Sequence, residues 1–372
     1  MEMNMLRFIN PVEGDVLMTE VDGEDVGGRL KTTVTIDAPQ SGAVTVNGVT
    51  ASISGGHYKA EIFLDGYRNR IEAIDASGNK QAITVFWFAR ANRKYRFTVD
   101  DLIIALQDLT VNKDKYKSIF ENPFLKIFKE AHDKYGSLVH INVFYENPDG
   151  SFNLSMVTDK FRKEFIANSD WMTFTFHAQR EFPDAPYRNA PYQQMIEDCR
   201  RVTREIKRFA GKEVLRDTTT LHFATANLYG TRALRTFGFK ALCGYFCRDD
   251  KGNPIISYYL DKDQQDRRDF WVDTAEGIIF VKEGIVLNAP EWTADKVAPF
   301  LDEIGARKQG KGFIQMVIHE QYFYPDYVNY EPDYAERILK MAEWMKKHGY
   351  ESASLSEIIR EDVPGVSARD ED

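Results

Sequence analysis

The sequence predicts a multidomain chain: an all-β sandwich over residues 1–92, an α/β domain over residues 93–360 and an acidic tail over residues 361–372. A length of 372 residues is long for one domain, so at least two are expected. The first part alternates apolar and polar residues with a period of two, whereas the second alternates strand-like runs with helical patterns. A short polar segment, residues 89–94, separates the regions with these two patterns.

Short strands with tight turns account for the N-terminal part. Residues 30–36 alternate as a half-buried strand does, and Asn47-Gly48 joins two apolar runs as a hairpin turn. The stretch 69–79, with its turn at Ser77-Gly78-Asn79, resembles the late strands of bacterial immunoglobulin-like modules on carbohydrate enzymes. It carries no catalytic cluster. We therefore expect this domain to support or extend the second one, with glycan binding as the alternative.

Strands and helices alternate in the second part. Apolar residues at three- and four-residue spacing predict helices over residues 195–209 and 334–345. The strand-like runs lie at residues 138–144, 171–176, 218–221, 240–242 and 313–318. Such alternation implies parallel βα units, and about seven of them predict a barrel or a broad open sheet.

Composition and charge argue against some classes of function. The net charge of −9 argues against a nucleic-acid partner, because such binding depends on Lys and Arg contacts to phosphates. No run reaches the roughly 18 apolar residues of a membrane span, and the first residues lack a signal-peptide pattern. A cytoplasmic location is the default expectation, and export with removal of a leader is the alternative. Cys199, Cys243 and Cys247 form no CxxC pair and fit reduced thiols.

Acidic residues and histidines follow the predicted strands at equivalent positions. They are Asp100-Asp101, His177, His222 and His319-Glu320. In parallel βα architectures the carboxyl ends of the strands share one face, so these side chains should converge on one pocket. The alternative for Asp100-Asp101 is a helix N-cap, since Leu102-Ile103-Ile104 begins a plausible helix. Three histidines at matching strand ends favour the functional interpretation.

The spacing of His177 and Glu181 indicates a metal site. On one turn of helix, residues at i and i+4 lie on the same face, where they would clamp a divalent cation together with Asp101. A mixed nitrogen and oxygen ligand set suits Zn²⁺, with Mn²⁺, Co²⁺, Ni²⁺ or Fe²⁺ as alternatives. A neighbouring base, Asp100, and an acid on the opposite side, His319, would complete a hydrolytic site.

The stretch Phe97-Thr98-Val99-Asp100-Asp101 resembles the T-[FY]-D-D motif of the polysaccharide deacetylases, the NodB-homology family or carbohydrate esterase family four. The resemblance covers about residues 95–360 and includes residues 234–240 and His348-Gly349-Tyr350. It implies an irregular (β/α)7 barrel, with Asp100 as the base and Asp101 as a metal ligand.

Two further motifs are matched in part. The family's H-[ST]-x-x-H motif supplies two metal ligands; here it reads His177 to Glu181, with Glu181 in the place of the second histidine. Val317-Ile318-His319 resembles the late motif that supplies an acid. The Arg-Pro-rich third motif is missing and His222 occupies its place, either as an alternative metal ligand or as a partner to Asp100.

Aromatic loops beside the predicted site favour a sugar substrate. Tyr187 lies in the loop after Glu181, and Tyr322 and Tyr324 follow Glu320. Their rings suit stacking on pyranose faces, and the alternative is that they pack the loops onto the domain. Arg180 would neutralise the acidic cluster or bind an anionic glycan, or else it is simply solvated.

The leading hypothesis is a metal-dependent hydrolase that removes N- or O-acetyl groups from a carbohydrate, with Asp100 and His319 as catalytic residues beside Glu320. A second hypothesis keeps the fold but changes the bond to a C–N or glycosidic one, using Glu181, His222 and Glu320. A third is a glycan-binding protein on a catalytically altered deacetylase fold. The oligomeric state, the sugar and the metal have no signal in the sequence.

Overall fold

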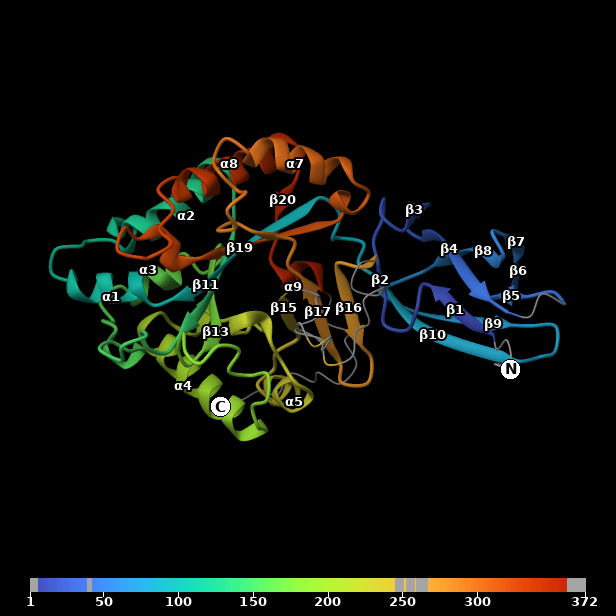
Figure 1. The fold of residues 1–372 in the computed structure, drawn as a ribbon, viewed down its shortest axis with the longest axis horizontal. Coiled ribbons are helices and arrows are strands. Elements are labelled where there is room, and N and C mark those ends of the chain that lie inside the picture. The colour runs from blue at the N-terminus through green and yellow to red at the C-terminus, as the bar shows by residue number, and fades with distance from the viewer. Residues whose placement is uncertain (1–5, 39–41, 245–250, 252–257, 259–266, 360–372) are drawn as a thin grey trace.

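The computed structural model describes residues 6–38, 42–244, 251, 258 and 267–359 (Figure 1). It is a mixed α/β protein with several sheets, and the β-rich N-terminal part lies at one end of the molecule. The predicted acidic tail, Cys247 and the first five residues lie outside the described residues.

The N-terminal part consists of two sheets that enclose one apolar core, as the sequence predicts. The buried residues of β4 alternate with more exposed ones along the strand, which is the period of two seen in the sequence. At the hairpin, Asn47 and Gly48 have φ values of 47° and 81°, the left-handed conformation that this turn requires. The immunoglobulin-like classification stays a prediction. One sheet contains β1 (Arg7–Asn10), β4 (Leu30–Asp37), β8 (His57–Leu64) and β7 (Ser52–Ser54), with β3 (Gly23–Asp25) on β4; the other contains β2 (Val16–Leu17), β10 (Lys80–Trp87), β9 (Arg68–Ile74), β5 (Thr45–Val46) and β6 (Val49–Thr50).

Parallel strands organise the second part, in two hydrogen-bonded sheets rather than one. The larger has the order β13-β12-β11-β19-β18, with β20 beside β11, and the smaller has the order β14-β15-β17-β16. An isolated bridge joins Phe174 of β13 to Leu215, which precedes β14. Closure into one barrel is therefore not shown by the described strands. The strands are β11 (Lys94–Leu102), β12 (Val139–Phe144), β13 (Met172–Ala178), β14 (Thr218–Thr220), β15 (Ala241–Gly244), β16 (Phe270–Asp273), β17 (Ile278–Lys282), β18 (Ile285–Val286), β19 (Phe313–His319) and β20 (Glu351–Ser352).

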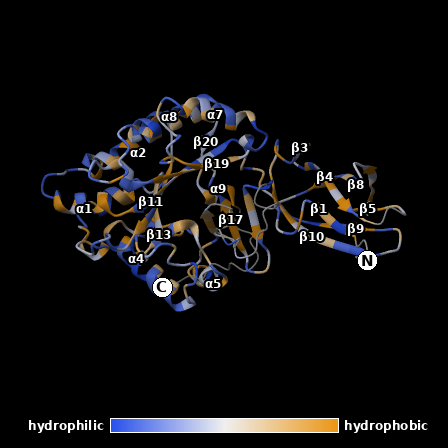
Figure 2. Cartoon of the chain, viewed as in Figure 1, coloured by the Kyte–Doolittle hydropathy of each residue, from blue (hydrophilic) through white to orange (hydrophobic). Residues whose placement is uncertain are grey.

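Helices cover the outside of these sheets (Figure 1). The predicted apolar stripe of α4 is buried from Met195 to Phe209, and that of α8 from Tyr334 to Met345. Figure 2 shows the central strands in mostly hydrophobic colours, whereas the helices alternate between the two. No described helix is long and apolar enough to span a membrane. The helices are α1 (Ile104–Val111), α2 (Pro123–Tyr135), α3 (Arg162–Ala167), α4 (Tyr192–Phe209), α5 (Leu228–Thr236), α7 (Val297–Ala306), α8 (Tyr334–Lys347) and α9 (Leu355–Ile358).

A buried interface joins the two parts. Apolar residues of β2 and β10 form one cluster with β15, β16, β17 and α9. Within this interface, Arg268 Nη2 lies 3.1 Å from Asp15 Oδ2, and its Nη1 lies 3.0 Å from Asp22 Oδ1. Because a buried ion pair is tolerated only with close geometry, this contact fixes how the sandwich sits against the smaller sheet.

Candidate metal centre

The acidic pair lies at the carboxyl end of β11, and both side chains are buried. Asp100 pairs with His319 of β19 in the parallel ladder. Asp101 has a φ of 67°, the left-handed conformation that non-glycine residues rarely adopt. Such a conformation costs about 1–3 kcal/mol and persists only where the surroundings enforce it, which is common at functional sites.

The pair does not cap the helix that follows it. Helix α1 begins after Ile103, and its N-terminus has no cap from a neighbouring side chain. Instead, the Glu320 carboxylate accepts the backbone N–H groups of Ile103, Ile104 and Ala105 at 2.7–2.8 Å. The N-cap alternative for Asp100-Asp101 is therefore wrong. Glu320, predicted as catalytic, is fully buried and serves as the anion at this helix N-terminus.

Three potential metal ligands converge above the strand ends. His177, in β13, places Nε2 2.9 Å from Asp101 Oδ1, and His222 places Nδ1 3.3 Å from the same oxygen. The two imidazole nitrogens are 3.2 Å apart. All three side chains are buried, and their ligand atoms lie within 4.8 Å of one another. The sequence predicted Asp101, His177 and His222 near one site, and the structure brings them together.

The outer hydrogen bonds of both rings fix their tautomers. His177 Nδ1 lies 2.6 Å from the Thr220 carbonyl oxygen, and His222 Nε2 lies 2.9 Å from the Glu181 carbonyl oxygen. Each of these nitrogens must carry a proton, because a carbonyl only accepts. The inner nitrogens of the neutral rings are consequently bare and face each other and the carboxylate.

Three lone pairs at these distances repel one another unless a proton or a cation lies between them. The other oxygen of Asp101 accepts Gln321 Nε2–H at 2.8 Å, so Oδ1 is the atom left for the centre. Backbone carbonyls and an amide that orient ligand side chains in this way are typical of the outer shell of metal sites. Two imidazoles and a carboxylate fit a divalent cation such as Zn²⁺ with an open coordination position.

The directions of the pKa shifts of Asp101, His177 and His222 agree with this arrangement. Burial acts to raise the pKa of Asp101, but the hydrogen bonds that His177 and His222 donate when their inner nitrogens are protonated outweigh it and hold that pKa well below its usual range. Burial lowers the pKa of His177. For His222 burial acts in the same direction, yet the Asp101 carboxylate dominates and raises the pKa. The proton that His222 thereby attracts is the one a bound cation would displace.

Asp100 has a separate environment beside this centre. Its Oδ1 accepts Asn142 Nδ2–H at 2.6 Å. Burial raises its pKa well above the usual value, and the negative charges of Glu283 and Asp101 add to this effect. A carboxylate with a raised pKa is a stronger proton acceptor, as a general base requires.

His319 lies across the ladder from Asp100. Its Nδ1 is 2.7 Å from Asn288 Oδ1, so this nitrogen is the donor and Nε2 is the free nitrogen of the neutral ring. Burial lowers the pKa of His319. No described residue hydrogen-bonds Nε2, which leaves it available to a substrate.

The predicted helical turn from His177 to Glu181 is wrong. β13 continues through Ala178, and residues 179–182 are not helical, so the i, i+4 argument does not apply. Glu181 contacts the centre through its backbone carbonyl, and its carboxylate is not among the three converging groups. Burial, together with the charge of Asp101, raises the pKa of this carboxyl to about 7.

The predicted substrate-binding residues fall into two groups. Tyr187 is buried and Tyr324 is half-buried, and each is held by a carboxylate: the Tyr187 hydroxyl donates to Asp198, and the Tyr324 hydroxyl donates to Glu320. These rings pack the loops, as the alternative interpretation states. Tyr322 is partly exposed with its ring 6.1 Å from that of His319, whereas Arg180 is half-exposed and pairs with Glu146.

Four polar residues of the site were missed from the sequence: Asn142, Glu283, Asn288 and Gln321. Glu283 follows β17 directly, as the predicted residues follow their strands, so its position was the available signal. Its Oε1 accepts Thr220 Oγ1–H at 2.7 Å and Gln315 Nε2–H at 3.0 Å. Asn142 lies inside β12, and nothing in a buried strand distinguishes such an amide from a core residue.

Comparisons with known proteins show distant structural likeness. No protein-family model matches the chain, and neither does any curated protein. A Streptococcus mutans CE4 esterase is 12% identical over 72% of this chain and 87% of its own, with a TM-score of 0.40. A 4-alpha-glucanotransferase from Thermococcus litoralis is 12% identical over 71% and 39%, with a TM-score of 0.42.

A third structure, from Bordetella bronchiseptica, is described as a polysaccharide deacetylase involved in O-antigen biosynthesis. It is 10% identical over 68% of this chain and 84% of its own, with a TM-score of 0.32. Each likeness is too distant to place the chain in a family. The chemistry of this chain must therefore be inferred from the geometry of the Asp101–His177–His222 centre.

Proposed function

We propose that this protein is a metal-dependent hydrolase that removes N- or O-acetyl groups from a carbohydrate. The observation that carries the proposal is the convergence of three bare acceptor atoms, from Asp101, His177 and His222, on one buried point beside Asp100. The carbohydrate and the acetyl group come from the resemblance of residues 97–101 to the deacetylase motif.

Asp101, His177 and His222 would hold the cation. Of the two residues that the sequence offers as the third ligand, Glu181 and His222, we assign this role to His222. When bound, a divalent cation polarises a carbonyl oxygen and lowers the pKa of water towards neutrality. Burial of all three ligands strengthens these electrostatic effects, because water is excluded from the site.

Asp100 would act as the base in this scheme. Its carboxylate lies next to the ligand Asp101 and is held by Asn142, so it has a fixed direction from which to take a proton from water. A cation beside it would favour the ionised form that burial disfavours. The two adjacent aspartates thus have different roles, one in proton transfer and one in binding.

His319 would deliver a proton to the leaving group. Asn288 accepts the Nδ1–H and so fixes the ring, which leaves Nε2 as the nitrogen that would carry the proton. Tyr322, with its ring near His319, is the residue best placed to contact the sugar. Arg180, which is exposed and pairs with Glu146, would serve as a secondary contact for an anionic sugar.

The experiment is release of acetate from acetylated oligosaccharides by protein loaded with Zn²⁺, measured before and after chelation. We expect activity in the loaded protein, loss after chelation and loss in His177→Ala. His348→Ala is the matched control, because His348 is exposed at the end of α8 and should leave activity unchanged. Acetate release that survives both chelation and His177→Ala would contradict the proposal. Other products without acetate would instead indicate hydrolysis of a different bond.

A further inference from the structure

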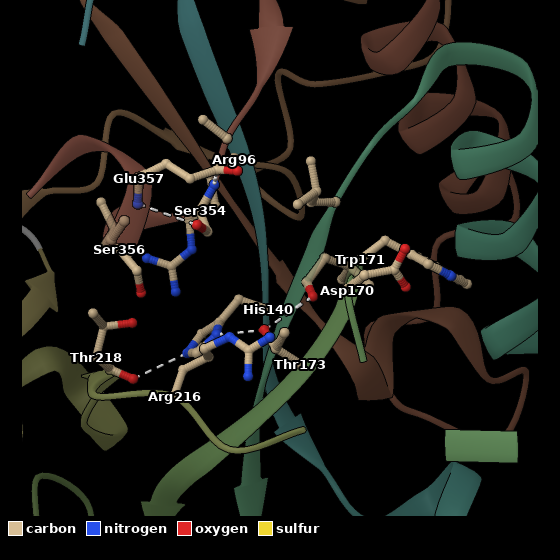
Figure 3. Close-up of a pocket in the computed structure, with 14 residues that line it drawn as sticks. Arg96, His140, Asp170, Trp171, Thr173, Arg216, Thr218, Ser354, Ser356 and Glu357 are labelled. Carbon is tan, nitrogen blue, oxygen red and sulfur yellow. Dashed lines mark hydrogen bonds between the residues drawn. The ribbon is translucent and has the colours of Figure 1, made fainter. Parts of the chain in front are cut away.

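A second polar pocket lies at the opposite end of the parallel strands. It has a volume of about 270 Å³ and is formed where β11, β12, β13 and β14 begin, closed on one side by residues 353–357 (Figure 3). Arg96 and Asp100 are four residues apart on β11, which separates their positions by about 13 Å at the rise of a strand. The pocket is therefore distinct from the candidate metal centre.

The Arg96 side chain lies at the inner end of this pocket, and one of its nitrogens lacks a hydrogen-bond partner among the described residues. Its side chain is 2% exposed, and its Nη1 donates to Gln315 Oε1 at 3.2 Å and contacts Cys243 Sγ at 3.5 Å. Its Nη2 has no hydrogen-bond partner among the described residues. Figure 3 shows the guanidinium group extending into the hollow between Ser354 and Thr218. A buried, unpaired guanidinium nitrogen is costly unless a ligand or water completes it.

A second guanidinium group, that of Arg216, adds positive charge to the pocket. Arg216 lines the pocket and donates to the backbone carbonyls of Glu213, Leu215 and Ser169. Neither Arg96 nor Arg216 forms an ion pair with a described carboxylate within 4 Å. Asp217 acts electrostatically on Arg216, and Arg96 acts on Glu283 and Asp100, but none of these three carboxylates lines the pocket.

The remaining walls are neutral or lie at the rim. His140 uses Nδ1 on Thr173 and Nε2 on the Thr218 carbonyl, and burial lowers its pKa well below the usual value. Asp170 and Glu357 also line the pocket, but both are exposed, where water screens their charge. Ser356, exposed at the mouth, offers a hydroxyl.

We propose that this pocket binds a small oxyanion, the phosphate group of inorganic phosphate or of a small phosphorylated metabolite. Guanidinium groups are the donors that suit phosphate best. Arg96 offers its unpartnered Nη2 as such a donor at the inner end of the pocket. The volume is larger than one phosphate group, which leaves room for a short carbon skeleton towards the mouth at Ser356.

The test is calorimetric titration of the full chain with inorganic phosphate and with glycerol 1-phosphate, at constant ionic strength. Both should bind, and glycerol alone should not. We expect Arg96→Met to weaken binding about tenfold or more, since it removes a charge-assisted hydrogen bond. Ser356→Asp should weaken it also, because it adds a negative charge at the mouth of the pocket without disturbing a buried residue.

Controls separate this site from the metal centre. Arg200→Met, which changes an exposed arginine of α4, should bind phosphate as the wild type does. His177→Ala should also retain binding, which rules out phosphate on a metal at Asp101. The inference is overturned if neither probe binds, if Arg96→Met and Ser356→Asp bind unchanged, or if His177→Ala abolishes binding.

Discussion

The two ends of strand β11 differ in charge and in the kind of group that lacks a hydrogen-bond partner: acceptors at one end and a donor at the other. At its carboxyl end, Asp101 and the neutral rings of two histidines present converging lone pairs, whereas near its amino end Arg96 presents an N–H with no acceptor among the described residues. The first end therefore fits a cation and the second an anion. Because alternate residues of a strand point to one side, β11 places Arg96, Thr98 and Asp100 on the same inward face.

A chain of hydrogen bonds runs between the two ends. Arg96 donates to Gln315, Gln315 donates to Glu283, and Thr220 also donates to Glu283. The Thr220 carbonyl then orients His177. These buried polar side chains connect the two ends, and the difference between the ends can be tested by changing one residue at a time.

The largest effect is expected from the base at the carboxyl end. Asp100→Asn keeps the shape and the hydrogen bond to Asn142 but removes the proton acceptor, so deacetylation should fall by about 10²–10⁴-fold. Bound zinc, measured by mass spectrometry, should stay at the wild-type level. A variant that loses metal together with activity would show that Asp100 is a ligand and that the two aspartates do not have separate roles.

Glu320 tests whether every acidic residue at this end takes part in chemistry. Glu320→Ala leaves the first N–H groups of α1 unsatisfied, so the free energy of unfolding should fall by about 1–3 kcal/mol, measured by urea denaturation. Glu303→Ala, at an exposed position of α7, is the control. Loss of activity at unchanged stability would restore Glu320 to the catalytic set.

An effect of similar size that appears only as the pH changes concerns Glu283, between the two ends. Burial raises its pKa to about 7 from 4.5, so the folded protein binds this proton more tightly than the unfolded chain does. Stability is therefore lost as the pH rises from about 4.5 to 7. Glu283→Gln removes this loss, so its advantage over the wild type should be about 1–3 kcal/mol greater at pH 8 than at pH 4. An equal difference at both pH values would contradict the assignment.

Most of the site that could be predicted from the sequence was found from the positions of residues relative to the ends of the predicted strands. Residues at the carboxyl end of a parallel strand, such as His177 and His319, lie at one face of the domain whatever the details of the loops. The same rule, applied to the strand at 278–282, would have found Glu283. The pattern of α4 was equally clear, since an apolar stripe of three- and four-residue spacing must face a core.

The errors came from local conformation and from contacts distant in sequence. The spacing of His177 and Glu181 places them on one face only within a helix, and β13 continues past His177. Glu320 and Gln321 are adjacent, yet one serves the N-terminus of α1 and the other binds Asp101. Sequence alone does not show these partners, because they lie more than 200 residues away.

Metal content of two variants tests the Asp101–His177–His222 centre most directly. Wild-type protein, His222→Ala and Glu181→Gln would each be loaded with Zn²⁺, desalted and measured for zinc per chain. Glu181→Gln preserves the backbone carbonyl that His222 uses, so it should retain zinc as the wild type does, whereas His222→Ala should lose it. Retention by His222→Ala with loss in Glu181→Gln would contradict this ligand assignment and identify the Glu181 carboxylate as the third ligand.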